Sequence, residues 1–171
     1  MGSGKTTIGK LLASKMNLQF IDLDLFIENR YRKKIKEIFA EKGEDEFRKI
    51  EQATLQEIAS FENILISTGG GAPCFFDNMK LMNELGLTVY LKASPKELVN
   101  RLSSYQHNRP LIKDKSPEEM IIFVAENLNK RNIYYNQALI IFDFDQLNDS
   151  QDMDEIVDNL HKRLISINHE R

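Results

Sequence analysis

Several residue types that define protein classes are scarce in this 171-residue sequence. Cys74 is the one cysteine, so a disulfide within one chain is impossible, and three histidines leave little material for a structural metal site. No apolar run approaches the length needed to cross a bilayer, and we expect no signal peptide. The net charge is -3 with mixed signs, so no basic face indicates nucleic acid or a membrane as a partner. We expect a cytoplasmic monomer.

The residues that are present have the composition of an ordinary globular domain, 42% hydrophobic and 29% charged. Short apolar runs alternate with segments of helical periodicity. We expect strands within residues 18–26, 63–68, 87–93 and 138–144. We expect helices after Lys5 and within residues 34–43, 44–61, 78–85, 94–104, 116–135 and 152–167. This order predicts a parallel sheet with helices on both faces.

The first residues, MGSGKTTIGK, contain the second half of a phosphate-binding loop, whose full pattern is G-x-x-x-x-G-K-[ST]. Backbone N–H groups of such a loop, with the positive end of the next helix, bind phosphate. Lys5 would reach the transferred phosphoryl group and Thr6 would offer its hydroxyl to magnesium. The alternative is a Gly-Ser turn with a surface lysine and threonine. The nucleotide-binding set that we predict is Gly2, Ser3, Gly4, Lys5, Thr6 and Thr7.

The first glycine of that pattern would lie two residues before Met1, and the strand that leads into the loop would precede it. A parallel sheet without a central strand would leave unpaired backbone groups in its core. We therefore expect the native sequence to begin upstream of Met1, with an apolar run, a glycine and one more residue.

Two further segments are candidates for ligand contacts. In FIDLD, Asp22 and Asp24 would share one face of a strand end, at the edge where open parallel sheets bind ligands. One carboxylate can help to hold magnesium and the other can accept a proton; alternatively, the pair caps the next helix. In ISTGGGAP, the run Gly69–Gly71 would let a ligand approach the main chain, whereas a plain turn needs fewer glycines.

Three arginines lie at places that suit anion binding. Arg48 precedes Glu51 by one helical turn, and Glu51 could hold its guanidinium. Arg48 and Arg131 come from different helices and could bind one carboxylate by paired hydrogen bonds. Arg109 lies in a polar segment that we expect to be a mobile loop, from which an arginine can neutralise a moving phosphoryl group. Taken alone, each of them fits a solvated surface residue better than a site residue, and the functional interpretation depends on the set of three.

The ordered set GSGKT, FIDLD, FRKIE, GGG, RPL and KRNIYY resembles shikimate kinase, over residues 1 to about 145. The resemblance implies an ATP-dependent small-molecule kinase of the nucleoside-monophosphate-kinase type. Such an enzyme phosphorylates the 3-hydroxyl of shikimate, a step toward chorismate and the aromatic amino acids. ATP and shikimate would be the ligands and Mg²⁺ the cofactor.

Carried over residue by residue, the resemblance implies that Asp24 binds the ring hydroxyls and is the base. Asp22 would lie near the metal with Thr6, and Lys5 and Arg109 would contact the phosphates and act in catalysis. The shikimate-binding set would be Asp24, Arg48, Gly70, Gly71 and Arg131. The implied fold is a three-layer α/β/α domain of P-loop kinase type over residues 1–171. Its five-stranded, mainly parallel sheet lacks the central strand here, its substrate-binding helices cover about 25–60, and its mobile lid covers about 104–118.

Two other functions stay open on the sequence alone. A kinase for another small polyol acid, such as gluconate, would need the same carboxylate and hydroxyl contacts. A nucleotide-binding module without catalysis is the second alternative, because the front of the phosphate loop is missing.

Overall fold

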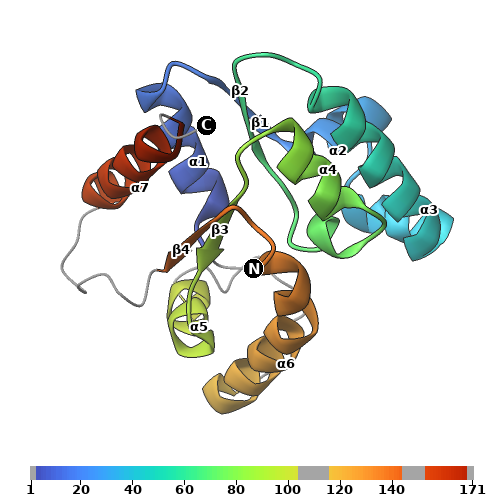
Figure 1. Cartoon of the computed structure of the whole chain (residues 1–171). Helices are drawn as coiled ribbons and strands as arrows, with labels where there is room; N and C mark the ends of the chain where they lie inside the picture. Colours follow the sequence, from blue (N-terminus) through green and yellow to red (C-terminus); the bar gives the residue numbers. More distant parts are fainter. Residues whose placement is uncertain (1–2, 104–115, 144–152, 169–171) are drawn as a thin grey trace.

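The structure is a computed structural model, which describes residues 3–103, 116–143 and 153–168 (Figure 1). Helices and strands alternate along the chain, as the periodicity predicts. The helices are α1 (Lys5–Lys15), α2 (Leu23–Tyr31), α3 (Ile35–Ile58), α4 (Asn78–Leu85), α5 (Pro95–Ser103), α6 (Pro117–Tyr135) and α7 (Met153–Asn168). The strands are β1 (Gln19–Asp22), β2 (Ile64–Ser67), β3 (Val89–Lys92) and β4 (Ile140–Asp143), and a short 3-10 turn, η1, covers Ala72–Cys74.

The four strands form two parallel pairs. β1 pairs with β2, so that Asp22 lies opposite Ser67, and β3 pairs with β4, so that Lys92 lies opposite Asp143. The prediction of parallel pairing is confirmed. Within residues 3–103, 116–143 and 153–168, no strand joins β2 to β3, and the two pairs are separate sheets. The expected count of five strands stays a prediction.

A cavity of about 770 Å³ lies between the two sheets. Its walls include Leu65 and Ile66 of β2 on one side and Val89 and Leu91 of β3 on the other, and α1 contributes Ile8. The side chains that face each other across the cavity are therefore largely apolar, and the backbone edges of β2 and β3 border it.

Each sheet has its own hydrophobic core. Around β3 and β4, buried residues come from α1, α5, α6 and α7, among them Leu12, Val99, Val124 and Leu160. Figure 1 shows α1 and α7 on one side of these strands, and α5 and α6 on the other. Around β1 and β2, the core is formed with α2, α3 and η1. Helices on both faces of the strands confirm the predicted layers.

Local signals in the sequence explain where helices begin and break. Ser116 begins α6: its hydroxyl accepts from the Glu119 N–H at 3.2 Å, and the Glu119 carboxylate accepts from the Ser116 N–H at 2.7 Å. Gly43 interrupts α3 with φ 79 and ψ 172, which confirms the predicted break. Among the helices of the described ranges, none combines the length and the apolar character needed to cross a membrane.

Candidate active site

The loop before α1 has the geometry expected of a phosphate-binding turn. Gly4 precedes the helix with φ 78, a left-handed conformation that favours glycine. Lys5 and Thr6 form the first turn of α1, the end of a helix at which the backbone N–H groups and the helix dipole attract anions. Ser3 is buried, and both Ser3 and Lys5 border the cavity between the sheets. Gly2 lies outside the described residues.

Thr6 and Asp22 meet beside this turn. The Thr6 hydroxyl donates to Asp22 Oδ2 at 3.0 Å, and Asp22 Oδ1 accepts from the Leu25 N–H at 3.2 Å. Asp22 therefore caps α2 and also contacts the phosphate-loop threonine, so both roles considered for it from the sequence are compatible. A hydroxyl and one carboxylate are oxygen ligands that Mg²⁺ accepts when phosphate oxygens and water complete its shell. No cluster of three His, Cys, Asp or Glu side chains suited to a metal occurs among the described residues.

Asp24 is not on a strand, and the prediction that it shares a strand face with Asp22 is wrong. Because Asp22 caps α2, β1 ends there and Asp24 falls in the first turn of the helix. This turn directs Asp24 at the glycine run: a Cβ atom built on Gly69 would lie 2.9 Å from Asp24 Oδ1. Both acids still lie at the carboxyl end of β1.

The surroundings of Asp24 change its acidity. Burial raises the pKa of the Asp24 carboxyl, the nearby Asp22 carboxylate raises it further, and the positive charges of Lys5 and Arg48 oppose the shift. Asp24 and Arg48 both lie against the glycine run, and Lys5 borders the same cavity as Gly69. A carboxylate with a raised pKa is a better proton acceptor than an ordinary aspartate.

Arg48 is held firmly at this point. Its side chain is 11% exposed, its Nη1 donates to Glu51 at 2.8 Å, and its Nη2 donates to Glu44 at 3.0 Å. The Phe75 ring lies against the guanidinium, with 4.1 Å from the ring centroid to Cζ. The Glu51 contact is the one expected from the spacing. Glu44, one turn earlier on α3, is a partner that sequence reasoning missed although its i,i+4 spacing indicates it.

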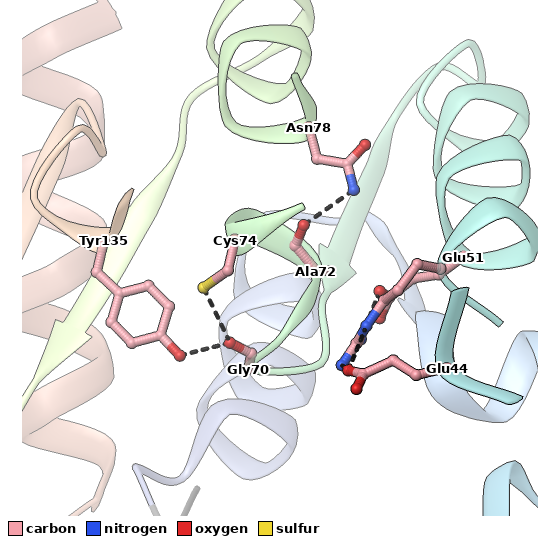
Figure 2. A network of polar contacts seen from close by, with 8 residues as sticks. Glu44, Glu51, Gly70, Ala72, Cys74, Asn78 and Tyr135 are labelled. Carbon is pink, nitrogen blue, oxygen red and sulfur yellow. Dashed lines mark hydrogen bonds and ion pairs between the residues drawn. The ribbon is translucent and has the colours of Figure 1, made fainter. Parts of the chain in front are cut away.

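The glycine run lies against Arg48 and Asp24. A Cβ atom on Gly71 would lie 2.6 Å from Arg48 Nη1, so a larger residue would displace the guanidinium. Figure 2 shows Tyr135 and Cys74 pointing at the Gly70 carbonyl oxygen, to which they donate at 2.5 Å and 3.9 Å. The turn that follows is fixed as well, because the amide of the buried Asn78 donates to the Ala72 carbonyl oxygen at 2.9 Å (Figure 2).

Arg131 approaches the same place from α6. Burial raises the pKa of the Cys74 thiol, and the positive charges of Arg131 and Arg48 oppose that shift. α3 and α6, which carry Arg48 and Arg131, both contact η1, so two helices distant in sequence meet beside the glycine run. Arg109 and most of the expected lid, 104–118, lie outside the described residues.

Similarity to known proteins agrees with this geometry. The shikimate kinase family model matches residues 1–161. This chain belongs to the shikimate kinase family. It is 57% identical over 165 residues to a shikimate kinase of Azobacteroides pseudotrichonymphae, covering 96% of this chain and 95% of the relative. It is 54% identical over 164 residues to a shikimate kinase of Parabacteroides distasonis, with the same two coverages of 96% and 95%.

Solved structures of the family have the same fold. A crystal structure of shikimate kinase from Bacteroides thetaiotaomicron matches with a TM-score of 0.89 and 46% identity, over 96% of this chain and 93% of that one. Shikimate kinase from Acinetobacter baumannii, in complex with shikimate, matches with a TM-score of 0.79 and 27% identity, over 97% and 89% of the two chains. The predicted family, the α/β P-loop kinase fold and the class of ATP-dependent phosphotransferase are thus confirmed.

Proposed function

We propose that this chain transfers the γ-phosphoryl group of ATP to the 3-hydroxyl of shikimate, giving shikimate 3-phosphate and ADP on the route to chorismate and aromatic amino acids. The observation that carries the proposal is the meeting of Asp24, Arg48 and the glycine run beside Lys5. Shikimate has one carboxylate and three hydroxyls, so it needs a positive clamp and an acceptor close together. Family membership and the A. baumannii relative in complex with shikimate support this choice of substrate.

In this proposal, Arg48 and Arg131 bind the shikimate carboxylate. Glu51 and Glu44 already hold the Arg48 guanidinium, so little side-chain freedom is lost when the substrate binds. Arginine suits the role because its planar group can make two parallel hydrogen bonds to one carboxylate. The backbone of Gly70 and Gly71 would complete the floor under the substrate ring.

Asp24 binds the ring hydroxyls and accepts the proton of the attacking 3-hydroxyl. Its raised pKa, caused first by burial, brings its basicity closer to that task. Lys5, which borders the same cavity, would neutralise charge on the transferred group. Most of the catalysis comes from positioning and charge neutralisation, because phosphoryl transfer needs little covalent help from the protein.

The phosphates of ATP would bind at the turn before α1. Gly2, Ser3, Gly4, Lys5, Thr6 and Thr7 would surround it, and Arg109 would approach from the segment that follows α5. Mg²⁺ fits the oxygens of Thr6 and Asp22, which lie 3.0 Å apart, and when bound it would supply positive charge beside the phosphates. In the same proposal the protein is cytoplasmic and monomeric. Sedimentation of the purified protein would test the monomeric state.

Residues 1–171 form one P-loop kinase domain in this proposal, and a fifth strand would fit between β2 and β3. The cavity of about 770 Å³ between the two sheets supports it, because an extended apolar segment there could pair with both backbone edges.

The experiment that tests the proposed function is ADP release, coupled to a spectrophotometric readout, with shikimate or gluconate at equal concentrations. We expect turnover with shikimate and a far lower kcat/KM with gluconate, since gluconate is an open chain that does not match the fixed clamp. Asp24→Asn serves as the control, because it keeps the shape of the side chain and removes the proton acceptor. Equal or better turnover of gluconate would assign the chain to the other substrate.

A further inference from the structure

The hydrogen bond between Tyr135 and Gly70 has no place in the roles described so far. Tyr135 Oη donates to the Gly70 carbonyl oxygen at 2.5 Å. Tyr135 ends α6, which packs on β3 and β4, whereas Gly70 follows β2, and both residues border the cavity between the two sheets. We infer that Tyr135 is a positioning residue, which holds the glycine run in the geometry that receives shikimate. The inference rests on the proposed function.

Tyr135 also contacts the second arginine of the clamp. Arg131 lies one helical turn before Tyr135 on α6, so the two side chains are neighbours on one face. Burial raises the pKa of the Tyr135 phenol, and the positive charge of Arg131 opposes that shift. The phenol proton goes to the Gly70 carbonyl oxygen, and the positive charge of Arg131 acts on the phenol from the preceding helical turn. One side chain thus joins a residue proposed to bind the carboxylate to a residue proposed to contact the ring.

The direction of the Tyr135 ring is fixed by a second tyrosine. The Tyr90 ring of β3 lies 5.1 Å away, centroid to centroid, with the planes at 44°. The Tyr90 hydroxyl donates to Asn132 Oδ1 at 3.2 Å, which ties this ring to α6 as well. Burial raises the pKa of Tyr90 to about 12, so it keeps its proton at neutral pH. With both rings braced in this way, the Tyr135 hydroxyl reaches Gly70 in one orientation.

Little else can replace the Tyr135 hydroxyl at Gly70. The Cys74 thiol donates to the same carbonyl oxygen, but at 3.9 Å and as a weak donor. Without the phenol, the Gly70 carbonyl oxygen loses its hydrogen bond at 2.5 Å, and the glycine run loses a direct link to α6. Loss of the Tyr135 hydroxyl should therefore weaken shikimate binding. ATP binding should be spared, because none of the hydrogen bonds described here joins Tyr135 to the phosphate turn before α1.

The test is Tyr135→Phe, which keeps the ring and removes the hydroxyl, with Tyr134→Phe as the matched control at the next position of the same helix. One lost hydrogen bond of ordinary strength corresponds to about a three- to tenfold change in binding. We expect the KM for shikimate to rise by that factor in Tyr135→Phe, with the KM for ATP and kcat within about twofold of the wild type, and no change in Tyr134→Phe. Calorimetric titration with shikimate should give the same factor.

The possible outcomes distinguish a failure of the positioning role of Tyr135 from a failure of the proposed kinase activity. An active wild type and a Tyr135→Phe variant with an unchanged KM for shikimate would overturn the inference and leave the proposed function standing. A parallel rise of both KM values would also overturn it, because it indicates general loosening of the fold. A wild type that binds shikimate by calorimetry, more weakly after Tyr135→Phe, yet transfers no phosphate would support the inference and contradict the proposed catalysis.

Discussion

Replacement of Gly71 by alanine should damage shikimate recognition without touching the phosphate turn. The new Cβ atom would lie 2.6 Å from Nη1, 2.7 Å from Nη2 and 2.9 Å from Cζ of Arg48. Ordinary contact begins near 3.4 Å, so the guanidinium must retreat by at least 0.8 Å. It cannot do so freely, because Glu51 and Glu44 hold it and the Phe75 ring lies behind it.

A displacement of this size at a substrate-positioning group costs on the order of 100-fold in rate. We therefore expect kcat/KM for shikimate to fall by about two orders of magnitude in Gly71→Ala, with the KM for ATP within about twofold of the wild type. Steady-state kinetics with each substrate varied in turn measures both.

Gly86→Ala is the matched control. Gly86 ends α4 in an extended conformation, and a Cβ atom there meets nothing within 4 Å. The same chemical change should therefore leave both KM values unaltered. If Gly71→Ala keeps kcat/KM for shikimate within about threefold of the wild type, the close packing of Arg48 on the glycine run does not determine recognition, and the reasoning is refuted.

Three further predictions concern other parts of the site. Arg131→Ala should remove a charge-assisted contact worth about 2 kcal/mol or more, so calorimetry should show shikimate binding weakened at least about 25-fold and ATP binding nearly intact. Asp24→Asn should lower kcat far more than ATP affinity. The same variant should also raise the thermal midpoint of unfolding at neutral pH. Burial raises the pKa of Asp24 in the folded protein, so the folded state loses stability as the pH rises from the unfolded-state pKa to the folded-state pKa. Asparagine does not ionise and avoids that loss. Thr6→Val should increase the Mg²⁺ concentration needed for half-maximal rate and leave the KM for shikimate unchanged, measured by metal titration of the coupled assay.

The sequence was informative where short-range rules decide the structure. Gly43 breaks a helix because its φ is positive, and Ser116 begins one because its hydroxyl binds the N–H of Glu119. The Arg48–Glu51 contact follows from helical spacing alone. Each of these three features depends only on residues that are close in sequence.

The sequence left one local choice and the long-range contacts open. Asp24 leaves the strand because Asp22 caps α2, and both outcomes fit the letters FIDLD equally well. Tyr135 reaches Gly70 over 65 positions of sequence, and Phe75 lies on Arg48 across the glycine run. No periodicity connects such partners. The site residues themselves rest on the family resemblance and stay predictions. Glu51 was expected beside Arg48 from its spacing, whereas Phe75 and Tyr135 became visible only in the fold.

The most direct measurement is a crystal structure of this protein with shikimate and a non-hydrolysable ATP analogue. The account predicts the shikimate carboxylate on the guanidinium groups of Arg48 and Arg131, and the 3-hydroxyl within hydrogen-bonding distance of Asp24, facing the terminal phosphate beside Lys5. Shikimate bound away from Asp24, or with its carboxylate turned toward the phosphate turn instead of the two arginines, would contradict it.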